Sequence, residues 1–140
     1  MKLIIGFLFV FFFISCGTGS ISYDKFFYEK VTGIKVPDSF KVLESFDNAE
    51  YLTGTTFGTD SLSIRRLVIK NCFSKVKKGG FPGLIDLERG YIKGNMPDKD
   101  HIEQLYFISK TVGKNSWVYI ADLKKGMLWT EITYPDWGGN

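Results

Sequence analysis

Two stretches of the chain repeat their hydrophobic positions with the period of a helix. In residues 22–33 the apolar stripe consists of Tyr23, Phe26, Phe27 and Val31, spaced i, i+3, i+4 and i+8. Ser22 is placed to cap the start of this helix and Gly33 to end it. In residues 60–73, Asp60 is the expected cap, and the expected core-facing residues are Leu62, Ile64, Leu67, Val68 and Cys72.

Elsewhere the pattern favours strands. Residues 39–46 alternate between apolar and polar, with Phe40, Val42 and Phe46 expected on one face. The other stretches rich in strand-forming residues are 51–59, 104–112, 116–122 and 127–134. Residues 116–122 are apolar on both faces, which predicts a central strand. Gly126 supplies a left-handed residue for a hairpin between the last two strands.

The resulting order is helix, two strands, helix, a loop over 79–100, and three strands. This order predicts one α+β domain spanning residues 22–140, in which an antiparallel sheet of about five strands carries two helices packed on one face. The length of 140 residues suits a single hydrophobic core. The loop over 79–100 contains five glycines and two prolines, and a loop of this length is often functional.

The first fifteen residues differ from the rest in composition. Lys2 is followed by an uncharged, phenylalanine-rich run from Leu3 to Ile14. Twelve helical residues extend about 18 Å, whereas a span of the bilayer core needs roughly 20 residues. A charged start followed by a short apolar run is therefore interpreted as a cleaved signal sequence, not as a permanent membrane span.

The sequence Phe13-Ile14-Ser15-Cys16 resembles a bacterial lipobox, in which apolar and small residues precede an obligatory cysteine. Phe13 stands where leucine is usual. The resemblance implies that residues 1–15 form a lipoprotein signal peptide, that the thiol of Cys16 receives a diacylglyceryl group, and that the new amino group is acylated. Residues 16–21 would then be a short tether. The alternative is that Cys16 is an incidental small residue of a secretory signal or of an uncleaved anchor.

Sorting signals after the cysteine predict where such an anchor would lie. Residues 17–20 contain no acidic run resembling a surface-export signal, and Gly17 is not the aspartate that retains some lipoproteins in the inner membrane. The resemblance therefore implies the periplasmic face of the outer membrane.

The charge of the chain argues against nucleic acid as a partner. Removal of Lys2 with the signal leaves 17 basic and 15 acidic residues, a net charge of +2, from the totals of 18 and 15. Nucleic-acid binding calls for a basic face with stacking aromatic residues. The cluster Lys70, Lys75, Lys77 and Lys78 is interpreted as favourable charge at a helix end and in a solvated loop. Cys72, with no partner thiol, is expected to be a buried small hydrophobic residue.

No motif predicts catalysis, a metal or a cofactor. Asp98, Asp100, His101 and Glu103 are close in sequence, but they lack a defined ligand spacing and would alternate between faces if they formed a strand. There is no G-x-S-x-G motif for nucleophilic hydrolysis. Carboxylate pairs for acid–base chemistry are available, as in any chain of this composition. The chain is therefore not predicted to be an enzyme.

Aromatic residues near the carboxyl end are the candidates for binding. Trp129 lies on the more polar side of its strand, Trp137 lies in the final residues, and Tyr134 is between them. Exposed tryptophan and tyrosine are enriched at protein interfaces, whereas the alternative for Trp129 is packing under the loop over 79–100.

These observations predict a membrane-anchored module that binds a periplasmic protein. An immunity protein or an inhibitor of an envelope-directed toxin or hydrolase would act in this way. In general character the chain resembles small single-domain envelope lipoproteins of the Bacteroidota. A carboxylate-dependent cell-wall hydrolase and a structural envelope component are the alternatives, and the oligomeric state is left open.

Overall fold

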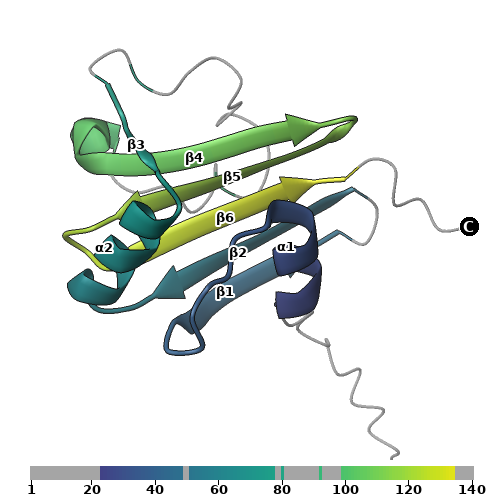
Figure 1. Cartoon of the computed structure of the whole chain (residues 1–140), viewed down its shortest axis with the longest axis horizontal. Helices are drawn as coiled ribbons and strands as arrows, with labels where there is room; N and C mark the ends of the chain where they lie inside the picture. Colours follow the sequence, from purple (N-terminus) through teal and green to yellow (C-terminus); the bar gives the residue numbers. More distant parts are fainter. Residues whose placement is uncertain (1–22, 49–50, 78–79, 81–91, 93–98, 135–140) are drawn as a thin grey trace, which may run out of the picture.

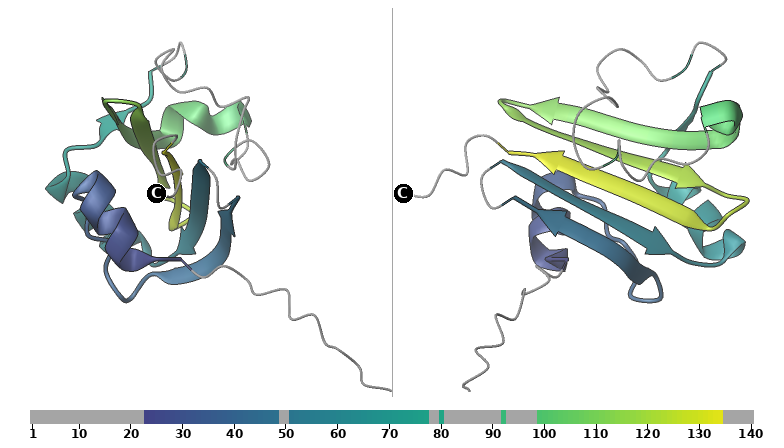
Figure 2. Two further views of the ribbon diagram at one scale, coloured as in Figure 1. Left: turned by 90° about the vertical axis from the view of Figure 1, so that its right-hand side faces the viewer. Right: turned by 180° about the vertical axis from the view of Figure 1, so that it is seen from behind.

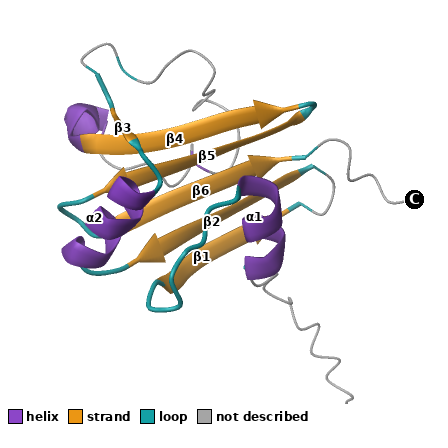
Figure 3. Ribbon diagram, viewed as in Figure 1, coloured by secondary structure: helices purple, strands orange, loops and turns teal. Residues whose placement is uncertain are grey.

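The computed structural model describes residues 23–48, 51–77, 80, 92 and 99–134. Within them the chain forms a six-stranded antiparallel sheet with two α-helices and one 3-10 helix (Figures 1 and 3). The elements are α1 (Lys25–Thr32), β1 (Lys41–Asp47), β2 (Leu52–Gly58), α2 (Ser61–Lys70), β3 (Ser74–Lys75), η1 (Lys99–Gln104), β4 (Leu105–Val112), β5 (Asn115–Asp122) and β6 (Met127–Thr133).

The predicted α+β class and the antiparallel sheet are confirmed. The strand order is β1-β2-β6-β5-β4-β3, so β5 has a neighbour on each side and is central, as its apolar sequence predicts. The sheet has one strand more than expected. The additional strand, β3, is only two residues long. A strand that short carries no detectable alternation.

Helix α1 begins and ends at residues that satisfy its terminal backbone groups. The Asp24 side chain accepts a hydrogen bond from the Phe27 backbone N–H, and Gly33 closes the helix with a left-handed φ of 73°. The predicted cap at Ser22 is therefore wrong. The buried residue of α1 is Tyr28, whereas the predicted core residue Phe26 is exposed.

Helix α2 has the predicted cap and three of the predicted core residues. The Asp60 carboxylate accepts hydrogen bonds from two backbone N–H groups, and Ile64, Leu67 and Val68 are buried. Leu62 is exposed, contrary to prediction. Cys72 also departs from prediction because the helix ends at Lys70: it lies beyond the helix with a φ of 54° and is exposed.

Strand β1 contains a bulge that the alternation of its sequence does not reveal. Val42 is opposite Phe57, but the next paired residue, Glu44, is opposite Thr56, so Leu43 is the extra residue. After the bulge Phe46 is opposite Gly54, on the other face of the sheet from Val42. The expectation that Val42 and Phe46 share a face is therefore wrong.

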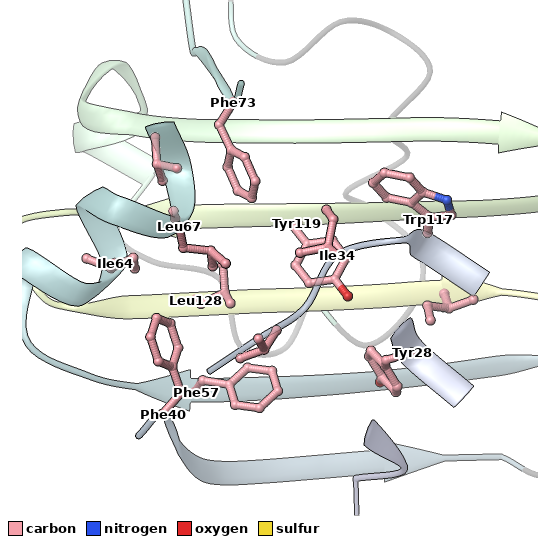
Figure 4. Packing of buried hydrophobic residues seen from close by; sticks show 14 of the residues in the cluster. Tyr28, Ile34, Phe40, Phe57, Ile64, Leu67, Phe73, Trp117, Tyr119 and Leu128 are labelled. Carbon is pink, nitrogen blue, oxygen red and sulfur yellow. The ribbon is translucent and has the colours of Figure 1, made fainter. Parts of the chain in front are cut away.

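The two faces of the sheet carry two separate buried clusters. Figures 1 and 2 place α1 and α2 on the same side of the sheet, here called the helix face. Its cluster includes Tyr28, Leu67, Tyr119 and Leu128 (Figure 4). The opposite side, here called the far face, carries the cluster Val76, Ile92, Leu105, Val118, Ile120 and Trp129. Most of the predicted loop over 79–100 lies outside the described residues.

Candidate functional site

Trp129 is not the exposed anchor that its position on a mixed strand face predicts. Only 4% of its surface is accessible, and it belongs to the far-face cluster that contains Ile92 and Ile120. The reason is its place in the sheet: β6 has β2 on one side and β5 on the other, with Trp129 opposite Thr56 and Ile120. The presence of Ile92 in the same cluster agrees with the alternative of packing under the 79–100 segment.

Tyr134 is also buried, and its hydroxyl has a structural partner. The hydroxyl donates a 2.8 Å hydrogen bond to Oδ1 of Asp47, and the ring packs edge-on against Phe27 at a centroid distance of 5.4 Å. Burial, followed by the hydrogen bond to Asp47, raises the pKa of Tyr134. The residue joins the end of β6 to β1 and α1, which gives its side chain a structural role, and its part in binding stays a prediction. Cys16 and Trp137 lie outside the described residues, and their roles stay predictions.

Several carboxylates accept hydrogen bonds that hold the backbone in shape. Asp24 and Asp60 cap the two helices, and Asp122 accepts from the backbone N–H groups of Lys124 and Lys125 in the β5–β6 turn. Glu131 accepts from the Ile92 backbone N–H at 3.1 Å. These contacts give each of the carboxylates a role in the fold.

The acidic segment around His101 forms a 3-10 helix, Lys99–Gln104, and not a strand. Asp98, the first acid of that predicted group, lies outside the described residues. Among the residues that the structure describes, no group of three or more His, Cys, Asp or Glu side chains could hold a metal ion.

A network of hydroxyl groups fixes β1 and β2 beneath α1. The Tyr28 hydroxyl lies 3.1 Å from the Thr53 hydroxyl and 3.0 Å from the Thr55 hydroxyl. Thr55 is in turn 3.2 Å from the Ser45 hydroxyl of β1. Burial raises the pKa of Tyr28, which keeps its phenol neutral. The hydroxyl groups of Thr53 and Thr55 in β2 therefore form hydrogen bonds inside the fold, and these bonds hold the edge of the sheet in a defined position.

Large apolar side chains gather at this edge of the sheet, where they are exposed. We define the β1 edge patch as Val42, Leu43 and Phe46 of β1 together with Tyr51, which precedes β2; all four are exposed. β1 is an edge strand of the sheet, with β2 as its neighbour. An exposed apolar group on an edge strand is typical of an interaction site, because edges are normally protected by charge or covered.

Glycines of β2 make room for the far-face members of the patch. A Cβ at Gly58 would lie 3.1 Å from Cδ1 of Leu43, so the leucine packs directly over the glycine backbone. Phe46 is opposite Gly54. The sequence signal for this site is therefore two glycines in β2, of which Gly54 is paired with Phe46 and Gly58 is in contact with the bulge residue Leu43.

Comparison with known proteins gives no family model, no curated relative and no solved structure that matches this chain. In the described part of the chain, no helix combines the length and apolar character needed to cross a bilayer.

Proposed function

We propose that this chain is a lipoprotein, attached through Cys16 to the periplasmic face of the outer membrane, whose folded domain binds another protein through the β1 edge patch. The observation that carries the proposal is the exposure of Leu43 and Phe46 on the far face of an edge strand. An inhibitor or an immunity protein against an envelope-directed toxin or hydrolase suits this arrangement, because such a protein acts by occupying its partner's surface.

The surroundings of the patch support a protein as the occupant. Lys41 and Glu44 are exposed beside the apolar side chains, and an apolar centre with a polar rim is the usual composition of a protein interface. The far-face members project from a sheet that the buried hydroxyl network holds in place. A rigid surface binds with a smaller loss of conformational entropy than a mobile one.

We also propose that both helices pack on one face of the sheet, as the sequence predicts. It is supported by the cluster that Tyr28 of α1 and Leu67 of α2 share with Tyr119 of β5. With the helices on that side, the far-face members of the patch remain accessible from the opposite side of the sheet.

The binding surface is tested with two matched substitutions in the full-length chain. Leu43 and Val112 are both 56% exposed, and their strands, β1 and β4, are separated by three other strands in the sheet. We expect Leu43→Asp to reduce recovery of a stoichiometric partner from native envelope by at least about ten-fold, because ten-fold corresponds to about 1.4 kcal/mol and the loss of a hot-spot residue at the centre of an interface costs about 2 kcal/mol or more. Val112→Asp serves as the control and should retain the partner.

Equal recovery with both variants would contradict the assignment of the surface. Wall-degrading activity that a single Asp or Glu substitution abolishes would instead favour the hydrolase.

The anchor is tested separately: the wild-type chain should incorporate a fatty-acid probe, and Cys16→Ser should not. A wild-type chain that stays unlabelled would contradict lipidation at Cys16.

A further inference from the structure

The outer surface of α2 carries large apolar side chains beside a cation. Leu62, Arg66 and Ile69 are spaced i, i+4 and i+7, so they form one stripe along the helix. This stripe lies opposite the buried residues of α2, and all three of its residues are exposed, Ile69 by 70%. A solvent-facing helix surface normally carries polar residues at such positions, so the two aliphatic side chains need a separate explanation.

Helix α1 repeats this arrangement. Phe26 is 76% exposed, and Lys30 follows it by one turn on the side of the helix away from buried Tyr28. Both helices lie on the same side of the sheet in the two views of Figure 2. We define the outer helix surface as Phe26 and Lys30 of α1 together with Leu62, Arg66 and Ile69 of α2.

The charge of this surface favours an anionic occupant. Helix α2 contains Arg65, Arg66 and Lys70 and no acidic residue. The carboxylate at its start, Asp60, accepts hydrogen bonds from the backbone N–H groups of Leu62 and Ser63. Aromatic or aliphatic side chains interspersed with Arg and Lys are typical of helices that lie in the interface of a bilayer with anionic lipids.

The chain connection points to the same occupant. Six residues lie between Cys16 and Tyr23, and the seven Cα–Cα steps from one to the other reach at most about 25 Å. A domain of roughly 110 residues has a radius of gyration of about 13 Å, so its opposite sides are more than 25 Å apart. A lipid at Cys16 therefore keeps α1, which begins two residues after Tyr23, near the membrane.

We propose that the outer helix surface docks on the anionic lipid surface, with Phe26, Leu62 and Ile69 in the interface and the cations of α2 at the headgroups. This inference rests on the proposed lipid anchor at Cys16. It orients the domain: the far-face members of the β1 edge patch, Leu43 and Phe46, then point away from the membrane, where a protein partner can reach them.

The test uses the lipidated full-length chain in vesicles of phosphatidylethanolamine and phosphatidylglycerol in a three-to-one ratio. In a Cys72→Ser background, one new cysteine carries an environment-sensitive NBD dye, either at Ile69→Cys on the outer helix surface or at Glu44→Cys beside the β1 edge patch. Both positions are exposed, and equal urea midpoints would show that both labelled chains fold.

We expect nitroxide-labelled lipids to quench the dye at position 69 and to leave the dye at position 44 unchanged. Changing both Arg65 and Arg66 to Gln should lower the docking equilibrium constant, the ratio of docked to undocked domains, by about five-fold for each charge removed. Replacing phosphatidylglycerol with phosphatidylcholine should also weaken the quenching at position 69.

Co-flotation with the vesicles separates failure of the inference from failure of the anchor. Flotation with no quenching at position 69, or with equal quenching at both positions, overturns the docking and leaves the anchor intact. Protection of position 69 only in native envelope, and not in pure vesicles, also overturns it, because the surface would then be covered by a protein. Absence of flotation in the wild-type chain overturns the anchor, and the docking with it.

Discussion

The β5–β6 hairpin and the start of α2 meet at Gly126, which tolerates no larger residue. Gly126 has a left-handed φ of 66°, and a Cβ built on it would lie 2.0 Å from the backbone oxygen of Thr59. The Thr59 N–H donates a 2.8 Å hydrogen bond to the Gly126 carbonyl, so the two backbones are held together at this point. Gly126→Ala should therefore force the two segments apart.

The chain also contains a matched control for the backbone conformation alone. Gly113 in the β4–β5 turn has a φ of 63°, but a Cβ there would meet no atom within 4 Å. Both substitutions carry the cost of about 1–2 kcal/mol for a left-handed alanine and the opposing gain of about 0.4–1 kcal/mol from a less flexible unfolded chain. These contributions cancel when the two variants are compared.

The difference that remains comes from the contact with Thr59. Overpacking costs about 1–3 kcal/mol, and a weakened backbone hydrogen bond costs about 0.5–1.5 kcal/mol. We expect Gly126→Ala to lower the free energy of unfolding by about 2–4 kcal/mol more than Gly113→Ala does. Urea unfolding followed by tryptophan fluorescence measures this difference as a shift of the midpoint at an unchanged slope. A difference below about 1 kcal/mol would refute the steric argument.

Three further expectations follow from buried and exposed polar groups. Tyr28→Phe removes a hydroxyl that contacts two β2 threonines and should cost about 1–2 kcal/mol in urea unfolding, whereas exposed Tyr51→Phe should cost less than about 0.5. Burial raises the pKa of Tyr119 above its ordinary value. The folded chain therefore keeps a proton that the unfolded chain loses above about pH 10, so the free energy of unfolding falls as the pH rises. Tyr119→Phe should reduce the slope of this fall by up to about 1.4 kcal/mol per pH unit. In native, lipidated protein a thiol reagent should titrate exposed Cys72 alone, and a second thiol would argue against modification of Cys16.

Local periodicity predicts the elements whose pattern is complete within one segment. Helix α2 has its cap at Asp60 and a buried stripe over the following two turns, and β5 is apolar on both faces because each face contributes to one of the two buried clusters. Gly126 has the left-handed φ that the hairpin needs. In these cases each residue type matches the local backbone and the global environment, which is why single-sequence reasoning succeeds.

The features that define the candidate site depend on pairing between distant residues. Phe46 has the same hydrophobicity on either face of β1, and only the bulge at Leu43 decides which face it occupies. Trp129 has a polar neighbour in Glu131, but it is buried in a cluster that includes Ile92, which lies far away in sequence. The hydrophobic pattern alone does not encode either arrangement. For this reason the predicted binding residue Trp129 is buried, whereas Leu43 and Phe46 are exposed.

The bulge in β1 also indicates how a partner would use this edge. An unbroken edge strand recruits other strands through its backbone, and a bulge interrupts that regular row of groups. Lys41 and Glu44 add exposed charges on either side of Leu43, which further disfavours a second strand. Contact through apolar side chains is unaffected by these features, because Leu43 packs over Gly58 and Phe46 is paired with Gly54 on the far face. We therefore expect recognition to depend on the size and polarity of these two side chains, and not on extension of the sheet.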